Sequence, residues 1–79
     1  MNNKEKYRQV FMNELQLKEG FYEAEIVAYK TDNWDSVGHM SLVTALEDAF
    51  DIMLDAEDIL DFDSYIHGIE ILKKYEVEI

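Results

Sequence analysis

The sequence predicts a small all-α protein, a four-helix bundle with three main helices and one short third helix, forming a single domain over residues 1–79. Apolar residues recur at helical spacing in separate segments, so each segment can bury one face. Proline is absent, and three glycines are the only strong breaks. The chain has 79 residues, 48% of them hydrophobic, which is enough for one core and too little for two.

The first helix is expected over residues 3 to 15. Its apolar residues recur at helical spacing: Tyr7, Val10, Phe11 and Leu15. Residues 16 to 35 are predicted to form a long loop with one helical turn. Apolar and polar residues alternate from Tyr22 to Ala28 as they would in a strand, but no second strand is available to pair with it.

The clearest helix begins at Ser36, where Asp35 or Ser36 can cap the free N–H groups, and ends near Asp51. Its predicted core stripe consists of Leu42, Ala45, Leu46, Ala49, Phe50 and Met53. A second, exposed face is then expected to carry Ser36, Met40, Val43 and Glu47, with Thr44 beside them. An apolar strip with an acidic rim is typical of a docking surface. We therefore expect Glu47→Lys to weaken partner binding without changing stability.

Two further helices complete the bundle. A short helix is predicted from Ala56 to about Asp61, with Asp55 as its cap and with Ile59 and Phe62 turned inward. The last helix starts after Asp63 and Ser64 and ends at Lys73 and Lys74, whose charges suit its C-terminal dipole. Its expected buried residues are Tyr65, Ile66, Ile69 and Leu72.

Acidic residues dominate one stretch of the chain. The formal net charge is −11, and from Thr31 to Leu72 there are eleven acids and no Lys or Arg. Such a surface repels nucleic acids and anionic membranes and attracts basic proteins, although it can also be a solubilising surface alone. The acids lack the glycine-centred spacing of a calcium loop. With no cysteine and no apolar run of about 18 residues, we expect a cytoplasmic monomer.

Ser36 is the residue that most suggests chemistry. A catalytic serine needs a base and an oxyanion site, and the only histidines are His39 and His67. His39 lies three residues along the same helix but has no third group to orient it. A serine modified by another enzyme is therefore favoured over a hydrolase, and a plain helix cap remains the structural alternative.

The segment Asp35-Ser36-Val37, followed by Leu42, Ala45-Leu46-Glu47, Phe50 and an acid-rich short helix, resembles the acyl carrier and peptidyl carrier protein superfamily over essentially the whole chain. The resemblance implies that a holo-carrier synthase, a phosphopantetheinyl transferase, attaches 4′-phosphopantetheine from coenzyme A to Ser36. The arm then holds cargo as a thioester, and the carrier itself is not an enzyme. Recognition of the transferase and of partners is expected from Asp35, Val37, Met40, Val43, Thr44, Glu47 and Asp48.

The same resemblance implies acyl or aminoacyl ligases, acyltransferases and synthases as partners. Trp34 and Gly38 depart from the usual fatty-acid carriers and favour a specialised or polysaccharide-linked pathway. Trp34 is expected to plug the loop, and His39 to be a partly buried packing residue. In fatty-acid carriers the chain enters between the second and third helices, where small residues give it room. His39, Ile59 and Phe62 occupy such positions here, which predicts a short or polar cargo. The rival hypothesis is an acidic helical adaptor that binds a basic partner without a prosthetic group.

Overall fold

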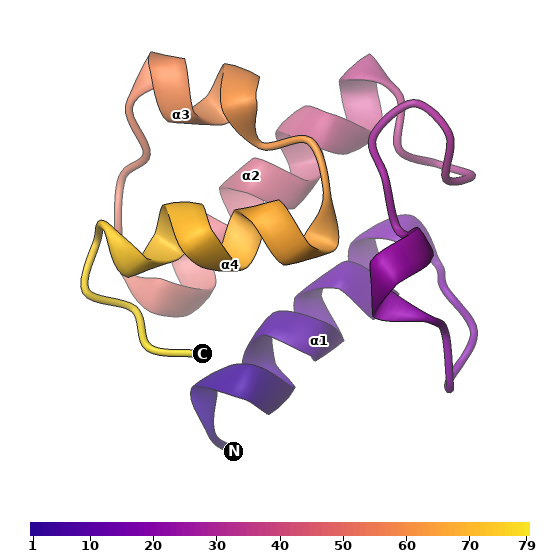
Figure 1. Cartoon of the computed structure of the whole chain (residues 1–79), viewed down its shortest axis with the longest axis horizontal. Helices are drawn as coiled ribbons and strands as arrows, with labels where there is room; N and C mark the ends of the chain where they lie inside the picture. The colour runs from indigo at the N-terminus through magenta and orange to yellow at the C-terminus, as the bar shows by residue number, and fades with distance from the viewer.

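The computed structural model describes all residues 1–79 and confirms an all-α bundle of four helices (Figure 1). The elements are α1 (Asn3–Leu15), the 3₁₀ turn η1 (Glu23–Glu25), α2 (Ser36–Phe50), α3 (Ala56–Asp61) and α4 (Tyr65–Lys73). These bounds agree with the predicted helices to within a residue, and η1 is the expected helical turn in the loop. No helix in the structure combines the length and apolarity that crossing a bilayer requires.

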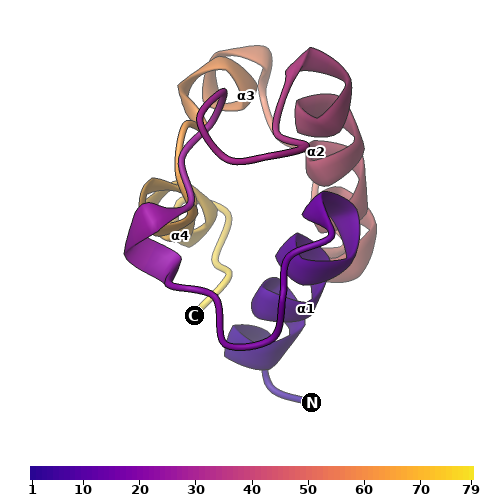
Figure 2. The same cartoon turned by 90° about the vertical axis from the view of Figure 1, so that its right-hand side faces the viewer.

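Helices α1 and α2 form an antiparallel pair. Figure 2 shows them on one side of the bundle, α3 and α4 on the other, and residues 16–35 crossing between the two sides. At one end of the pair, the Lys6 ammonium donates to the Ala49 carbonyl (3.2 Å) and lies 5.3 Å from the centre of the Phe50 ring. At the other end, the Asn33 side-chain amide donates to the Leu15 carbonyl (3.0 Å). Contacts at both ends therefore fix the helices along their length.

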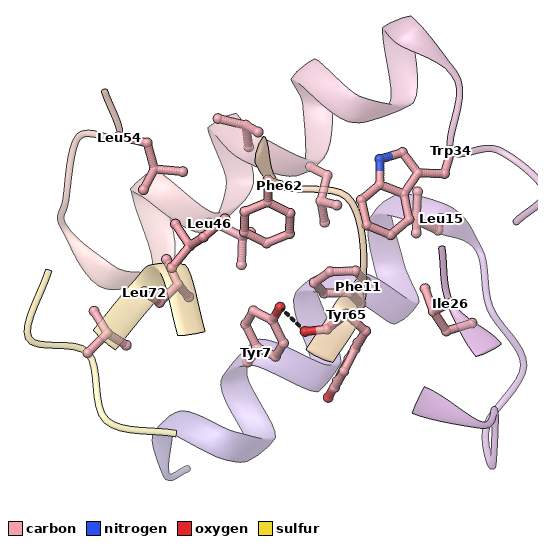
Figure 3. Close-up of a cluster of buried hydrophobic side chains, with 14 residues drawn as sticks. Tyr7, Phe11, Leu15, Ile26, Trp34, Leu46, Leu54, Phe62, Tyr65 and Leu72 are labelled. Carbon is pink, nitrogen blue, oxygen red and sulfur yellow. Dashed lines mark hydrogen bonds between the residues drawn. The ribbon is translucent and has the colours of Figure 1, made fainter. Parts of the chain in front are cut away.

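The core is built around aromatic rings from α1, the long loop, the end of α3 and the start of α4 (Figure 3). The buried rings are those of Tyr7, Phe11, Trp34, Phe62 and Tyr65. Phe11 lies at the centre, with its ring 4.7 Å from that of Tyr65 and 5.5 Å from that of Trp34. The Tyr7 hydroxyl donates to the Tyr65 carbonyl (2.7 Å), so its polar end is satisfied. Burial raises the pKa of the Tyr7 hydroxyl, and it raises that of Tyr65 to about 12.

Gly68 allows α4 to approach this aromatic core. A Cβ at position 68 would lie 2.2 Å from Cζ of Phe62 and 2.3 Å from the Tyr7 hydroxyl oxygen. These distances are far below any normal van der Waals contact, so a side chain cannot be added without moving a ring. The glycine therefore brings the α4 backbone directly against the core.

Three predicted burial assignments were wrong. Met53 was placed in the core but is 83% exposed, because α2 ends at Phe50 and Asp51 turns into the left-handed region (φ 54°). Ile66 was expected inside but is half exposed. It lies outside the buried face of α4, which consists of Tyr65, Gly68, Ile71 and Leu72. Val43 was expected on the exposed face and is buried.

The loop of residues 16–35 is hydrogen-bonded to the segment that joins α3 to α4. The Ala28 N–H donates to the Asp63 carbonyl (2.9 Å), and the Tyr65 N–H donates to the Ile26 carbonyl (3.0 Å). The strand-like alternation from Tyr22 to Ala28 thus ends in one short antiparallel bridge, between Val27 and Ser64. The sequence offered no second strand, and the partner is instead the link between α3 and α4.

Candidate functional site

Ser36 is the first residue of α2 and is exposed. The helix cap is Asp35, whose Oδ1 accepts the Gly38 N–H (2.8 Å). This geometry resolves the choice between Asp35 and Ser36 as the cap. Because Asp35 caps the helix, the Ser36 hydroxyl is not needed for that role and faces solvent at the positive end of the helix dipole.

The backbone before Ser36 is held by an unusually close contact. A Cβ at Gly38 would lie 1.9 Å from the Asn33 carbonyl oxygen, so only glycine fits while the loop follows this path. Asn33 has a left-handed backbone (φ 70°), which asparagine tolerates better than most residues. Since its side chain also bonds to Leu15, Asn33 links the end of α1 to the start of α2. Ser36 therefore projects from a fixed backbone.

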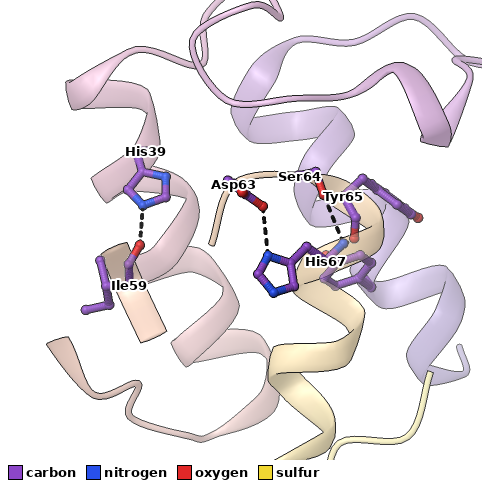
Figure 4. A network of polar contacts seen from close by, with 7 residues as sticks. His39, Ile59, Asp63, Ser64, Tyr65 and His67 are labelled. Atoms are coloured by element: carbon purple, nitrogen blue, oxygen red, sulfur yellow. Dashed lines mark hydrogen bonds and ion pairs between the residues drawn. The ribbon is translucent and has the colours of Figure 1, made fainter. Parts of the chain in front are cut away.

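A largely buried chain of hydrogen bonds joins this loop to α2 and α3. The Trp34 indole N–H donates to Nδ1 of His39 (2.9 Å). Nε2 of His39 lies 2.8 Å from the Ile59 carbonyl oxygen (Figure 4). An indole N–H can only donate, so Nδ1 is the acceptor and Nε2 carries the proton that it donates to Ile59. We call this chain the Trp34–His39–Ile59 bridge.

The bridge confirms the packing roles predicted for Trp34 and His39. Their rings are stacked at 15° with centres 6.1 Å apart, and His39 is only 9% exposed. Both imidazole nitrogens already have partners, so His39 offers no free base to Ser36. The second histidine, His67, is exposed and pairs with Asp63 (2.8 Å) at the start of α4.

The predicted recognition residues divide into two rows along α2. Residues four apart lie one above another on a helix. The first row, which we call the exposed row, consists of Ser36, Met40, Thr44 and Asp48. Val37 lies beside the exposed row and is 77% exposed. Asp35 directly precedes Ser36, the first residue of the row. These six residues share one accessible surface, as the sequence predicted.

The second row is less exposed: the exposure predicted for Val43 was wrong, and Glu47 is half-buried. It consists of His39, Val43 and Glu47, and we call it the inner row. His39 is bound to Ile59, and the Glu47 carboxylate accepts the Leu54 N–H (2.9 Å) in the link to α3. Val43, between them, is 1% exposed. Glu47 therefore anchors the link between α2 and α3, and Val43 belongs to the core.

A surface groove runs beside the exposed row, between α1 and α2. It has a volume of about 450 Å³. Its walls are formed by Glu14, Met40, Ser41, Thr44, Ala45 and Asp48. The contribution of Glu14 could not be read from the sequence, because it depends on how α1 lies against α2. The groove combines two carboxylates, two hydroxyls and the apolar side chains of Met40 and Ala45.

No protein-family model matches this chain, and no curated protein or solved structure does either. What Ser36, the exposed row and the groove can do is therefore inferred from their own geometry, together with the resemblance carried by Asp35-Ser36-Val37.

Proposed function

We propose that this protein is an acyl or aminoacyl carrier on which 4′-phosphopantetheine is attached to Ser36. The observation that carries the proposal is an exposed serine at a helix start whose capping role is taken by Asp35. Such a hydroxyl is accessible to a modifying enzyme. His39 is committed to Trp34 and Ile59, which favours a modified serine over a serine activated by the chain itself.

The surroundings of Ser36 suit a phosphodiester. The first N–H groups of α2 create a partial positive charge that favours an anion, and Asp35 is already engaged by Gly38. In the attachment reaction the Ser36 oxygen forms a bond to the phosphorus that bears the pantetheine arm in coenzyme A. The bond from that phosphorus to the bridging pyrophosphate oxygen breaks, adenosine 3′,5′-bisphosphate leaves, and the serine proton passes to the transferase.

When bound, the group supplies a terminal thiol that holds cargo as a thioester. The chain contributes position and recognition. Gly38, Asn33 and the Trp34–His39–Ile59 bridge fix the backbone that presents Ser36. Met40, Thr44 and Asp48 of the exposed row, together with Val37, form the surface that a transferase, a ligase or an acyltransferase contacts. Its acidity favours basic partners in the cytoplasm, in a specialised or polysaccharide-linked pathway.

Intact mass tests the attachment. The purified protein is incubated with coenzyme A and a broad-specificity phosphopantetheinyl transferase, and its mass is expected to rise by one phosphopantetheine. Ser36→Ala should abolish the increase. Ser64→Ala is the matched control, because Ser64 also stands at a helix start but caps α4 by accepting the His67 N–H (3.0 Å). An unchanged mass, or labelling of Ser36→Ala, overturns the proposal.

The acidic groove supports a second candidate, an adaptor for a basic partner that needs no prosthetic group. Glu14 and Asp48 line the groove, which gives it the charge such a partner would meet. An adaptor would bind its partner equally well before and after Ser36→Ala, and it would keep its mass in the transferase experiment. A carrier would lose all cargo transfer with that substitution.

A further inference from the structure

We infer that the cargo of this carrier stays outside the helix bundle, and that it is a short or polar acyl group and not a long alkyl chain. This rests on the proposed attachment at Ser36. A long alkyl chain tethered there would gain free energy by leaving water, so it would enter the interior if a path and a space existed. The structure closes the path and fills the space.

The path is closed by the Trp34–His39–Ile59 bridge. The interior nearest to Ser36 lies under the inner row, between α2 and α3. His39, in the first turns of α2, and Ile59, in α3, are joined there by a 2.8 Å hydrogen bond. To separate them would leave the Ile59 carbonyl and Nε2 of His39 facing an alkyl chain that cannot partner them. Polar groups in that state are strongly disfavoured, so the bridge opposes entry.

The space behind the bridge is already filled. Val43, Leu46 and Phe62 are each at most 1% exposed and belong to one continuous core. Gly68 does not provide room either, because the Phe62 ring and the Tyr7 hydroxyl occupy the position where its side chain would be. A close-packed interior of this kind does not accept extra methylenes without displacing side chains.

The hollows of the molecule lie on its surface. One is the groove beside the exposed row, and the other, of about 370 Å³, lies by η1 and the start of α4, with Phe21, Tyr22 and Ile66 in its walls. Neither has a wall from α3. The groove nearer Ser36 offers the hydroxyls of Ser41 and Thr44 and the carboxylates of Glu14 and Asp48. These walls suit a short or polar group and give a long alkyl chain little to bury against.

The test compares cargoes of different length on the modified protein. The phosphopantetheinylated protein is loaded with acetyl, octanoyl or dodecanoyl groups, and thioester hydrolysis and the amide chemical shifts of Leu46, Ile59 and Phe62 are followed. The three rates should agree within about twofold, because each thioester stays in water, and the amides should not shift with chain length. Slower hydrolysis of the long chains together with progressive shifts overturns the inference.

A variant tests the role of the bridge itself. His39→Ala removes the imidazole and leaves space between α2 and α3, so a dodecanoyl thioester should now hydrolyse several-fold more slowly than the acetyl one. Equal rates in His39→Ala would show that the bridge is not what closes the bundle. If this variant does not fold, the chain-length series on the native sequence still decides whether cargo enters.

A direct label separates this inference from the proposed function. The chain has no cysteine, so Ser36→Cys can be labelled at a single site with methyl or octyl methanethiosulfonate. The octyl label should leave the amide shifts of Leu46, Ile59 and Phe62 unchanged relative to the methyl label. No phosphopantetheine attachment with unchanged shifts would defeat the proposed function and support the closed bundle. Phosphopantetheine attachment together with amide shifts that depend on the octyl label would support the proposed function and overturn the closed bundle.

Discussion

The short helix α3 is held from its two sides by contacts of different chemistry. Toward α2 it is held by the Trp34–His39–Ile59 bridge, which uses uncharged groups and is largely buried. Toward the C-terminus it is held by Asp58, whose carboxylate accepts hydrogen bonds from the Lys74 ammonium and the Tyr75 hydroxyl. The Tyr75 hydroxyl in turn accepts the Asp55 N–H (2.9 Å). We call the second arrangement the Asp58 cluster.

The two contacts should respond to different conditions. Hydrogen bonds from Lys74 and Tyr75 hold the pKa of Asp58 below its ordinary value, so the Asp58 cluster depends on ionisation. Its ammonium partner is largely exposed, which allows salt to weaken it. The bridge contains no charge and little exposed surface, so its contribution depends mainly on keeping its polar groups paired. The six-residue helix α3 is therefore held by one contact that does not depend on salt and by another that does.

The largest effect is expected from His39→Leu. The substitution leaves the Trp34 indole N–H and the Ile59 carbonyl without partners, and it should lower the free energy of unfolding by about 2 kcal/mol. Urea denaturation at neutral pH measures the loss. His67→Leu is the control, since His67 is exposed and its removal should change the value by less than about 0.5 kcal/mol. Equal losses for the two histidines would show that the bridge contributes little.

A smaller effect is expected from Glu47→Lys. The Leu54 N–H loses its acceptor, so the free energy of unfolding should fall by about 1 kcal/mol. This differs from the expectation drawn from the sequence, in which Glu47 lay on the exposed face. Asp48→Lys makes the same charge change one residue away, in the exposed row, and should stay within about 0.5 kcal/mol of the parent protein. Thermal and urea denaturation of the pair would detect the difference.

Asp58→Asn should lower the urea midpoint at pH 7, and the effect should disappear in acid. The folded-state pKa of Asp58 lies below the unfolded value of about 3.9, so the ionised carboxylate stabilises the fold above that pH. This stabilisation is lost as the pH falls through the folded-state pKa. Urea midpoints of the parent and the variant should therefore converge on acidification. Glu57→Gln, an exposed acid of the same helix, should show no such gap at any pH.

The smallest effect is that of salt. The acidic residues between Thr31 and Leu72 repel one another. An ionic strength of about 0.15 M screens charges that are more than roughly 8 Å apart. The melting temperature should therefore rise from low to moderate salt. In the parent protein the rise is partly offset because salt also weakens the Asp58 cluster. Asp58→Asn should consequently show a larger rise, whereas His39→Leu should keep the parental salt dependence. A melting temperature that is flat in salt would contradict the expected repulsion.

The sequence predicted the helices well because each helix has its own apolar spacing and is bounded by residues that begin or end a helix. Gln16 and Asp51, which end α1 and α2, adopt left-handed backbones directly after the last helical residues, Leu15 and Phe50. Spacing placed Met40 in line with Ser36, but it put Val43 and Glu47 there in place of Thr44 and Asp48. It did not identify which neighbouring row faces α3, and so Val43 and Glu47 were assigned to the surface. That orientation depends on where a six-residue helix lies, which is set by His39, Leu54 and other contacts distant in the sequence.

Contacts between distant segments were likewise beyond the sequence. The loop bonds to Asp63 and Tyr65, and the groove includes Glu14, because the chain folds back on itself in ways that no local pattern specifies. Trp34 and His39 were expected to be packing residues, and the structure adds that they bond to each other. Two residues five apart, one in a loop and one in a helix, give no periodic signal of such a bond.

The close contact between Gly38 and the Asn33 carbonyl restricts which substitutions and insertions this part of the chain can accept. A descendant that replaces Gly38 must also reroute the backbone at Asn33, so the two positions should change together in evolution. Insertions between Asn33 and Ser36 should be rare for the same reason. Gly20 differs, because a Cβ there would meet nothing within 4 Å, and only its own positive φ (88°) disfavours another residue. Length variation among relatives should therefore gather around Gly20, far along the loop from the serine.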